Sequence, residues 1–151
     1  MRSIVICDID GTLADTSKRL HYLKQTPPNW DAFHEACDGD APIDATCAVV
    51  GGLVQLKGYL PIFVTGRPER VRTKTLHWLR AHLDGLNSTP DLHMRPDADH
   101  SEDYELKREI WKKRIAPMAE SVRLVLEDRG QCVKMWRELG LTCWQVAEGA
   151  Y

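Results

Sequence analysis

Short runs rich in apolar residues alternate along this chain with longer segments in which apolar residues recur every three or four positions. The short runs have the length of strands buried on both faces, and they lie at residues 4–6, 60–64, 92–94, 122–126 and 142–146. The longer segments have the period of an amphipathic helix, and they cover residues 45–57, 69–83, 103–114 and 133–139. A loop is expected at 85–90. This alternation predicts an α/β fold with a parallel sheet and right-handed crossovers.

One segment, residues 16–43, interrupts the alternation. Residues 17–24 predict a short helix, the Pro-Pro-Asn sequence at 27–29 ends it, and residues 30–37 resume an amphipathic pattern. We interpret the segment as a small helical insert that lies beside the first strand and over its carboxyl end. Its Arg19 follows that strand end closely enough to reach back toward it.

The first strand leads into two carboxylates. Asp8 and Asp10 flank Ile9, and Gly11 and Thr12 follow at once, so the segment has the pattern D-x-D-G-T. In a strand, side chains two positions apart point to the same side, and glycine lets the backbone turn away tightly. Two acids that converge in this way repel each other and favour a bound cation. A strand exit with two solvated aspartates is the alternative, and the complete motif after a buried strand disfavours it.

Polar residues also end two other predicted strands. Residues 65–67 (Thr-Gly-Arg) follow the second strand, and residues 127–129 (Glu-Asp-Arg) follow the fourth, whereas the polar stretch at 95–102 is expected to be exposed. Ligands bind at the carboxyl ends of the strands in a parallel α/β sheet, so these groups are expected to meet the two aspartates. Taken alone, Thr-Gly-Arg is typical of a helix cap, and Lys107 is typical of a solvated charge. Their joint occurrence with the acids makes a phosphate and metal site the stronger hypothesis.

Composition limits the classes of function. A chain of 151 residues suits one domain, 1–151, with a sizeable core. The chain has 20 lysines and arginines and 22 acids, so its net charge is close to zero. Binding of nucleic acid would therefore need a local basic patch, which the predicted helix offers in Arg70, Arg72 and Lys74. Five cysteines without a C-x-x-C pair indicate reduced thiols in a cytoplasmic protein. No signal peptide or membrane-length apolar run is present, which predicts a soluble protein without a membrane partner.

Residues 6–13 resemble the first motif of the haloacid dehalogenase (HAD) phosphohydrolase superfamily. The second, third and fourth motifs are matched in order by Thr65, Lys107 and the pair Glu127-Asp128. The resemblance implies a HAD-like (Rossmann-like) parallel sheet sandwiched by helices, with the insert as a small cap. It disfavours dehalogenation, because a second acid at Asp10 is a phosphatase feature within the superfamily.

The same resemblance implies a role for each motif residue. Asp8 attacks phosphorus to form an aspartyl-phosphate, and Asp10 protonates the departing alkoxide and later takes a proton from the attacking water. Lys107 neutralises charge on the phosphoryl group and the nucleophile. Mg²⁺ is the implied cofactor, held by the carboxylates of Asp8 and Asp128 and the main-chain carbonyl of Asp10, with Glu127 in the outer shell. The substrate phosphate is expected to contact Thr12, Thr65 and Gly66.

Two stretches, residues 104–117 and 126–149, are similar to the phosphatase domain of phage polynucleotide kinase–phosphatases. That family pairs a 5′-kinase with a HAD domain that removes 3′-phosphates from nucleic acid ends. The similarity implies further active-site residues, with Arg19 and Arg67 holding the phosphate or the strand end and Asp103 orienting a cationic partner. The chain departs from the family in its longer insert and in having no G-x-x-x-x-G-K-[ST] phosphate loop, so the kinase half is expected to be absent.

The resulting hypothesis is a Mg²⁺-dependent phosphomonoesterase that removes 3′-phosphates from DNA or RNA ends, with a separate kinase or ligase as a possible partner. A HAD nucleotidase acting on free nucleotides is the main alternative, because a cap that closes over Asp8 would exclude polymers. A non-catalytic domain that keeps the fold would be favoured by the loss of a motif acid or lysine, and it is disfavoured because Asp8, Asp10, Lys107 and Asp128 are all present. A metal-dependent nuclease is disfavoured by Thr65 and Lys107, which suit a transferred phosphoryl group.

Overall fold

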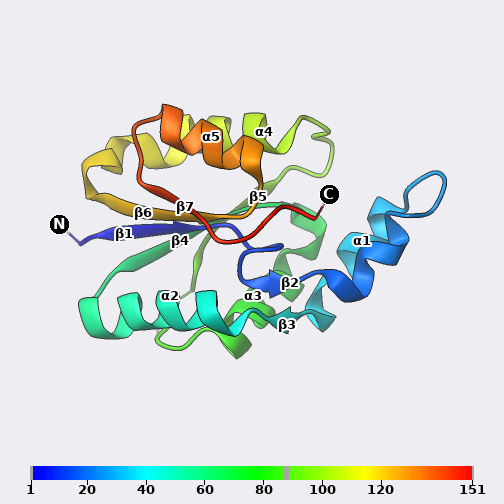
Figure 1. The fold of residues 1–151 in the computed structure, drawn as a ribbon, viewed down its shortest axis with the longest axis horizontal. Coiled ribbons are helices and arrows are strands. Elements are labelled where there is room, and N and C mark those ends of the chain that lie inside the picture. The colour runs from blue at the N-terminus through cyan, green and yellow to red at the C-terminus, as the bar shows by residue number, and fades with distance from the viewer. Residues whose placement is uncertain (1, 87–88, 151) are drawn as a thin grey trace.

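A five-stranded parallel sheet forms the centre of the computed structural model, which describes residues 2–86 and 89–150 (Figure 1). The strand order is β5-β4-β1-β6-β7, and all neighbouring strands pair in parallel. The strands are β1 (Ile4–Cys7), β4 (Leu60–Pro68), β5 (Asp91–Arg95), β6 (Val122–Glu127) and β7 (Cys143–Gln145). All five predicted strands are therefore present, and the expected α/β fold class is confirmed.

The central strand, β1, sets the position of the other strand ends. Its last residue, Cys7, is paired in register with Phe63 of β4 and Leu126 of β6. The polar residues that follow these three positions therefore emerge at the same edge of the sheet. This register brings together three segments that lie far apart in the sequence.

Two layers of helices enclose the sheet (Figure 1). One face is covered by α2 (Asp44–Lys57) and α3 (Arg72–His82), and the other by α4 (Asp103–Ile110) and α5 (Gly130–Glu138). Alternate residues of β1 point to opposite faces of the sheet. Val5 and Cys7 pack into the core beside α2 and α3. Ile4 and Ile6 pack into the core on the other face, which includes Trp136 of α5. A strand buried on both faces must be apolar at every position, which explains the continuous apolar run.

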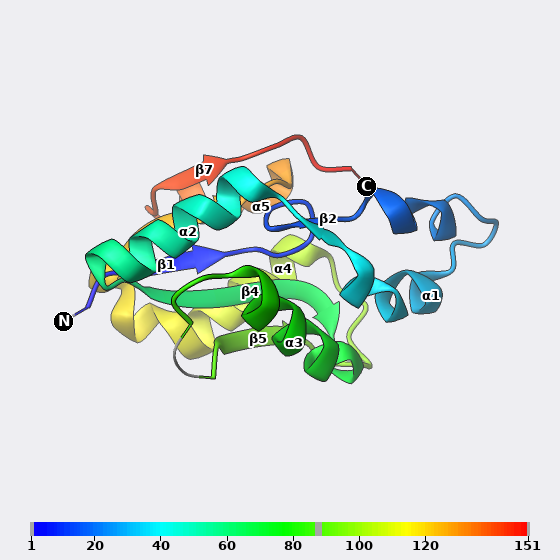
Figure 2. The same cartoon turned by 90° about the horizontal axis from the view of Figure 1, so that it is seen from below.

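The insert between β1 and α2 projects beyond the carboxyl edge of the sheet (Figures 1 and 2). Its two ends are joined by a short antiparallel pair that the sequence pattern did not predict, β2 (Ala14–Asp15) with β3 (Ala41–Pro42). Between them lie the 3₁₀ helix η1 (Ser17–Tyr22), the helix α1 (Trp30–Glu35) and the 3₁₀ helix η2 (Cys37–Gly39). Both expected helical segments are therefore present, the first as a 3₁₀ helix and the second shorter than predicted. Phe33 and Cys37 are fully buried and anchor the insert.

The segment predicted as one helix at 103–114 changes its winding. After α4 the chain forms a π turn at Trp111–Ile115 and the 3₁₀ helix η5 (Ala116–Ser121). Pro117 explains the change, because proline has no N–H to donate and its ring clashes with the preceding helical turn. A further 3₁₀ turn, η3 (Glu69–Val71), precedes α3.

Two other segments refine the sequence-based expectation. β4 runs beyond the predicted end at residue 64, because Pro68 resumes pairing with Arg95 of β5 after an irregularity. The stretch at 95–102 is mostly exposed, as predicted, but Arg95 and Asp99 are partly buried. Part of the loop expected at 85–90, residues 87 and 88, lies outside the described residues. Among the helices described, none has the length and apolar character needed to cross a bilayer.

Candidate active site

A tight turn after β1 places Asp8 against the end of β6. Gly11 has a φ of +79°, a left-handed conformation that glycine adopts without a steric penalty. A Cβ at this position would also overlap the carboxylate of Asp128. The turn is closed by a hydrogen bond from the Gly11 amide to the Ala14 carbonyl oxygen, at 2.9 Å. The glycine of the D-x-D-G-T motif therefore suits both the turn and the close approach of the Asp128 carboxylate to the backbone at Gly11.

Three carboxylates gather at this point. One oxygen from each of Asp8, Glu127 and Asp128 lies within 4.8 Å of the others, and all three residues are buried. Thr12 bridges two of them, since its hydroxyl lies 3.2 Å from Asp8 Oδ2 and 3.3 Å from Asp128 Oδ1. Burial and the charge of Glu127 raise the pKa of Asp8 well above its ordinary value. Hard oxygen donors with this excess of negative charge fit a divalent cation such as Mg²⁺.

Lys107 provides the balancing positive charge from α4. Its Nζ lies 2.8 Å from Asp8 Oδ1, 3.0 Å from Asp103 Oδ2 and 2.8 Å from Glu127 Oε2. Burial acts to lower the pKa of Lys107, but the three carboxylates outweigh it and raise the pKa well above the ordinary value. The lysine is therefore held protonated beside Asp8.

Both carboxylate oxygens of Glu127 contact hydrogen-bond donors. Its Oε2 accepts from Lys107, and the Nε1 of Trp136 lies 3.4 Å from the same oxygen. Its Oε1 lies 3.2 Å from the Asp128 amide and 3.3 Å from the Arg129 amide. These contacts occupy both carboxylate oxygens of Glu127, and its place in the outer shell of a cation stays a prediction.

Asp10 is held by both predicted arginines. Its Oδ1 lies 2.6 Å from Arg19 Nη2, 2.6 Å from Arg67 Nη2 and 2.8 Å from Arg67 Nε. Burial acts to raise the pKa of Asp10, but Arg67 and Arg19 outweigh it and lower the pKa to about 2. Both arginines are almost completely buried. In this structure their guanidinium groups therefore contact carboxylates of the protein.

A residue that the sequence did not single out, Asp40, completes this group. Its carboxylate accepts from Arg19 Nε at 2.9 Å and Nη2 at 2.7 Å, and from Arg67 Nη2 at 3.2 Å. Burial raises the pKa of Asp40, while the hydrogen bond and charge of Arg19 act the other way. Asp10, Asp40, Arg19 and Arg67 form a buried square of two negative and two positive charges, which we call the charge box. No local pattern distinguished Asp40 from the other polar residues of the insert.

The end of β4 meets the start of α4. Thr65 is fully buried, and its hydroxyl oxygen accepts from the Arg67 amide at 3.2 Å. A Cβ on Gly66 would lie 2.5 Å from Asp103 Oδ1, so a larger residue here would displace the Asp103 carboxylate. Besides Lys107, Asp103 contacts Arg95 Nη2 at 3.5 Å, and Lys107 is the leading cause that lowers the pKa of Asp103 against the effect of burial. All predicted site residues therefore lie around one edge of the sheet.

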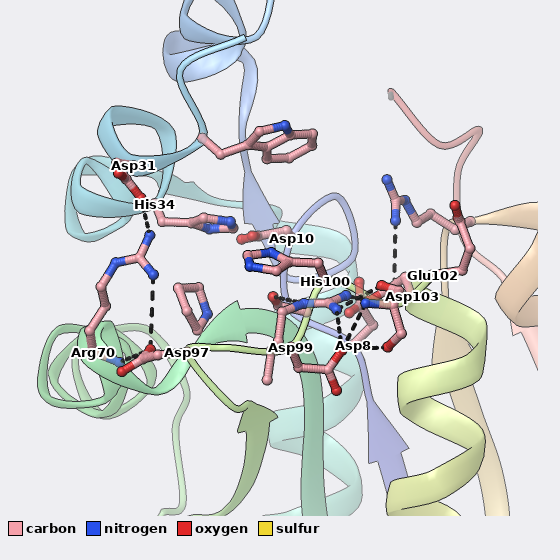
Figure 3. Close-up of a pocket in the computed structure, with 16 residues that line it drawn as sticks. Asp8, Asp10, Asp31, His34, Arg70, Asp97, Asp99, His100, Glu102 and Asp103 are labelled. Carbon is pink, nitrogen blue, oxygen red and sulfur yellow. Dashed lines mark hydrogen bonds and ion pairs between the residues drawn. The ribbon is translucent and has the colours of Figure 1, made fainter.

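A cleft of about 460 Å³ opens above these groups (Figure 3). It is lined by Asp8, Asp10, Trp30, Asp31, His34, Gly66, Pro68, Arg70, Arg95, Asp97, Asp99, His100, Ser101, Glu102, Asp103 and Arg129. Seven of these residues are acids and three are arginines. No pattern in the sequence singled out the contributions of α1 and of the 95–102 stretch to the cleft. The latter could have been found, because it follows a strand at the carboxyl edge where ligands bind.

Three positive charges of the segment after β4 are paired with acids. Arg70 lies 2.6 Å from Asp31 of the insert, and Lys74 lies 3.1 Å from Glu35 of the insert. Arg72 pairs within its own segment, 2.7 Å from Glu69. These residues therefore tie the insert to the body or stabilise the helix, and they do not form an unneutralised basic patch.

Comparison with known proteins agrees with this geometry. The profile of the family described as the polynucleotide kinase PNKP phosphatase domain matches residues 2–151. A protein of Autographa californica nuclear polyhedrosis virus that carries the name bifunctional polynucleotide kinase/RNA ligase is 29% identical over 136 residues, which cover 89% of this chain and 18% of the viral protein.

Comparison with solved structures also finds similar proteins. Chains from two structures of a Pnkp1/Rnl/Hen1 complex, one titled an RNA repair complex, match with TM-scores of 0.78 and 0.76 at 29% and 30% identity, covering all of this chain and 44% and 48% of theirs. This chain thus spans less than half the length of these relatives. A class C acid phosphatase from Bacillus anthracis, at 9% identity and a TM-score of 0.62, covers 97% of this chain and 68% of its own and shares the fold. From the match along nearly its whole length, the chain belongs to the family of polynucleotide kinase PNKP phosphatase domains.

Proposed function

We propose that this chain is a phosphomonoesterase that removes 3′-phosphates from the ends of nucleic acids through an aspartyl-phosphate on Asp8. The observation that carries the proposal is the position of Asp8. Its carboxylate lines the cleft, is held by Lys107 at 2.8 Å and lies beside the carboxylates of Glu127 and Asp128. Phosphoryl transfer mainly requires positioning and the neutralisation of negative oxygens, which this arrangement provides.

In the proposed first step, a carboxylate oxygen of Asp8 forms a bond to phosphorus while the bond from phosphorus to the leaving oxygen breaks. The leaving alkoxide takes a proton from Asp10, and in the second step Asp10 takes a proton from the water that hydrolyses the aspartyl-phosphate. Gly66 lines the cleft and can present its amide to a phosphate oxygen. The buried Thr65 hydroxyl holds the Arg67 amide in this turn.

The charge box determines the starting state of Asp10. With a pKa of about 2, Asp10 is ionised at neutral pH and ready to act as a base. To act as the acid in the first step it must first gain a proton. A phosphate that enters beside Asp8 and Asp10 brings further negative charge, which acts to raise the pKa of Asp10.

The residues present fit Mg²⁺. Asp8 and Asp128 would hold the ion with the main-chain carbonyl of Asp10, and Glu127 would support them from behind. When bound, Mg²⁺ would supply positive charge to offset the gathered carboxylates and the phosphate oxygens.

Family membership and the relatives named for polynucleotide kinase and RNA repair support a nucleic acid substrate and a separate kinase or ligase as partner. One observation favours a second candidate, a nucleotidase. The cleft carries more acids than arginines, and the arginine at position 70 is paired with Asp31. A long phosphate backbone gains little from such a lining, because contacts with phosphates need unpaired positive charge.

The test compares phosphate release from a 3′-phosphorylated oligonucleotide, its 5′-phosphorylated isomer, and free 3′- and 5′-mononucleotides, with Mg²⁺ at low and moderate salt. We expect the 3′-phosphorylated oligonucleotide to be preferred and Asp8→Asn to abolish turnover with an unchanged circular dichroism spectrum. Asp15→Asn, which alters an exposed acid of β2 outside the cleft, is the matched control. If the protein hydrolyses free nucleotides and releases no phosphate from oligonucleotides, the 3′-phosphatase proposal is rejected in favour of the nucleotidase. Full activity of Asp8→Asn would refute the assignment of Asp8 as the nucleophile.

A further inference from the structure

One wall of the cleft is aromatic. Trp30 and His34 lie one turn apart on α1 and both line the cleft together with Asp8 and Asp10. Their ring centroids are 5.9 Å apart with an interplanar angle of 26°, so the rings are stacked. Figure 3 shows the His34 ring pointing toward Asp10. The aromatic surface therefore stands directly beside the proposed site of reaction.

Trp30 also stands out by its exposure. It is 47% exposed, and among the described residues it is the one large exposed hydrophobic side chain that lines the cleft. By contrast, Phe33 of the same helix is fully buried. A large indole surface left in water beside an otherwise polar cleft indicates a ligand with a flat apolar face.

The helix that carries Trp30 and His34 is fixed to the catalytic residues. Phe33 packs edge-on against Trp30 at 5.8 Å, and the Arg19 guanidinium lies 4.1 Å from the centroid of the Phe33 ring. Arg19 also donates to the Phe33 carbonyl oxygen at 3.1 Å and to Asp10 at 2.6 Å. From the other side, Arg70 and Lys74 bind the acids of α1. The buried contacts of Arg19 and the more exposed ion pairs of Arg70 and Lys74 therefore hold α1 in place relative to the reacting acids.

His34 supports the stack as a neutral ring. Its Nδ1 is buried without a hydrogen-bond partner among the described residues. Burial lowers the pKa of His34 to about 4, and Arg19, Arg70 and Arg67 act in the same direction against the opposing charge of Asp10. At neutral pH an uncharged imidazole backs the indole, which suits stacking against a neutral aromatic ligand.

We propose that Trp30, backed by His34, is a stacking platform for the base of the nucleotide that carries the phosphate. The inference rests on the proposed function and names how that site recognises its substrate. Stacking suits a substrate of any sequence, because every base has a π-face. It also provides recognition that needs no positive charge, in a cleft where acids outnumber arginines.

The test uses two oligonucleotides that differ only in the 3′-terminal nucleotide, one with a normal base and one with a tetrahydrofuran sugar without a base, both 3′-phosphorylated. For Trp30→Ala we expect kcat/KM on the base-bearing substrate to fall roughly five- to a hundredfold, the range contributed by one base–aromatic stack. The abasic substrate should change less than twofold. Trp30→Phe should retain most of the activity, and Trp144→Ala, which removes a 55% exposed tryptophan outside the cleft, should behave as wild type.

Binding of the same oligonucleotides to Asp8→Asn, measured with and without the Trp30→Ala substitution, separates this inference from the proposed function. A loss of binding confined to the base-bearing oligonucleotide supports the platform even if the wild-type protein releases no phosphate from either oligonucleotide, a result that would reject the proposed function alone. Equal losses on both oligonucleotides, or no loss on either, would overturn the platform.

Discussion

The charge box makes a quantitative prediction about Asp40. Asp40→Asn keeps the shape of the side chain and removes one negative charge from a group whose members are almost completely buried. Arg19 and Arg67 then share the single carboxylate of Asp10. Breaking a buried ion pair by removing one partner costs about 3–5 kcal/mol, because a buried charge is left uncompensated. Burial disfavours the charged form of Asp40 and raises its pKa, but its removal leaves the guanidinium groups of Arg19 and Arg67 buried with one carboxylate fewer, and this second effect dominates. We therefore expect Asp40→Asn to lower the free energy of unfolding by about this amount.

Urea denaturation, followed by circular dichroism, measures the change. For a domain of this size, about 3–5 kcal/mol corresponds to a drop in melting temperature of roughly 6–20 °C. Asp38→Asn is the matched control, because this exposed acid lies two residues away in η2, and its substitution should change stability by less than about 0.5 kcal/mol. An Asp40→Asn protein as stable as the control would refute the reasoning.

A double-mutant cycle tests whether the loss comes from charge. Arg19→Met combined with Asp40→Asn restores the balance, leaving Arg67 with Asp10. The double variant should therefore lose less stability than the sum of the two single variants, by about 1–3 kcal/mol. Additive losses would indicate that packing, and not the charge box, sets the cost.

Three further predictions concern the remaining groups of the site. Asp10→Asn should slow the hydrolysis of alkyl phosphates by about a hundred- to ten-thousandfold and that of aryl phosphates much less, because a good leaving group needs no proton. Equal losses on both substrates in the phosphorylation step would argue against Asp10 as the acid. Mg²⁺ at a hundred times its dissociation constant should raise the free energy of unfolding of the wild-type protein by about 2.7 kcal/mol, and chelation should reverse this. The Asp128→Asn variant should lose most of this stabilisation by Mg²⁺. An unchanged stabilisation would exclude Asp128 as a ligand. The folded-state pKa of His34, about 4, lies below its ordinary value of 6.5, so only the unfolded chain gains this proton between the two values. Stability should therefore fall as pH drops from 6.5 toward 4, by up to about 3 kcal/mol, and His34→Gln should lack this component in urea titrations at each pH.

The sequence alone predicted the strands of the main sheet, most of the helices and most of the residues of the candidate site. Strands buried on both faces have a local signature, so the five strands and the acids at the end of β1 could be predicted without tertiary information. The common edge for Asp8, Thr65 and Asp128 also followed, because parallel strands end at the same side of a sheet. Lys107 was predicted from its order in the chain, and the structure places its amine 2.8 Å from Asp8.

Only the tertiary structure decided which charges meet. Asp40 has no local signal, and its pairing with Arg67 joins positions 27 residues apart through the fold of the insert. The sequence predicted that Arg19 and Arg67 hold the phosphate or the strand end, and this role stays a prediction. In the structure both arginines contact Asp10, and their charges lower the pKa of that acid to about 2 against the effect of burial. Trp30 had the same helical periodicity as a core residue, and the packing of Phe33 beneath it left the indole in the cleft. Periodicity reports which side of an element is buried, while the partner of a charged or aromatic side chain depends on how separate elements pack.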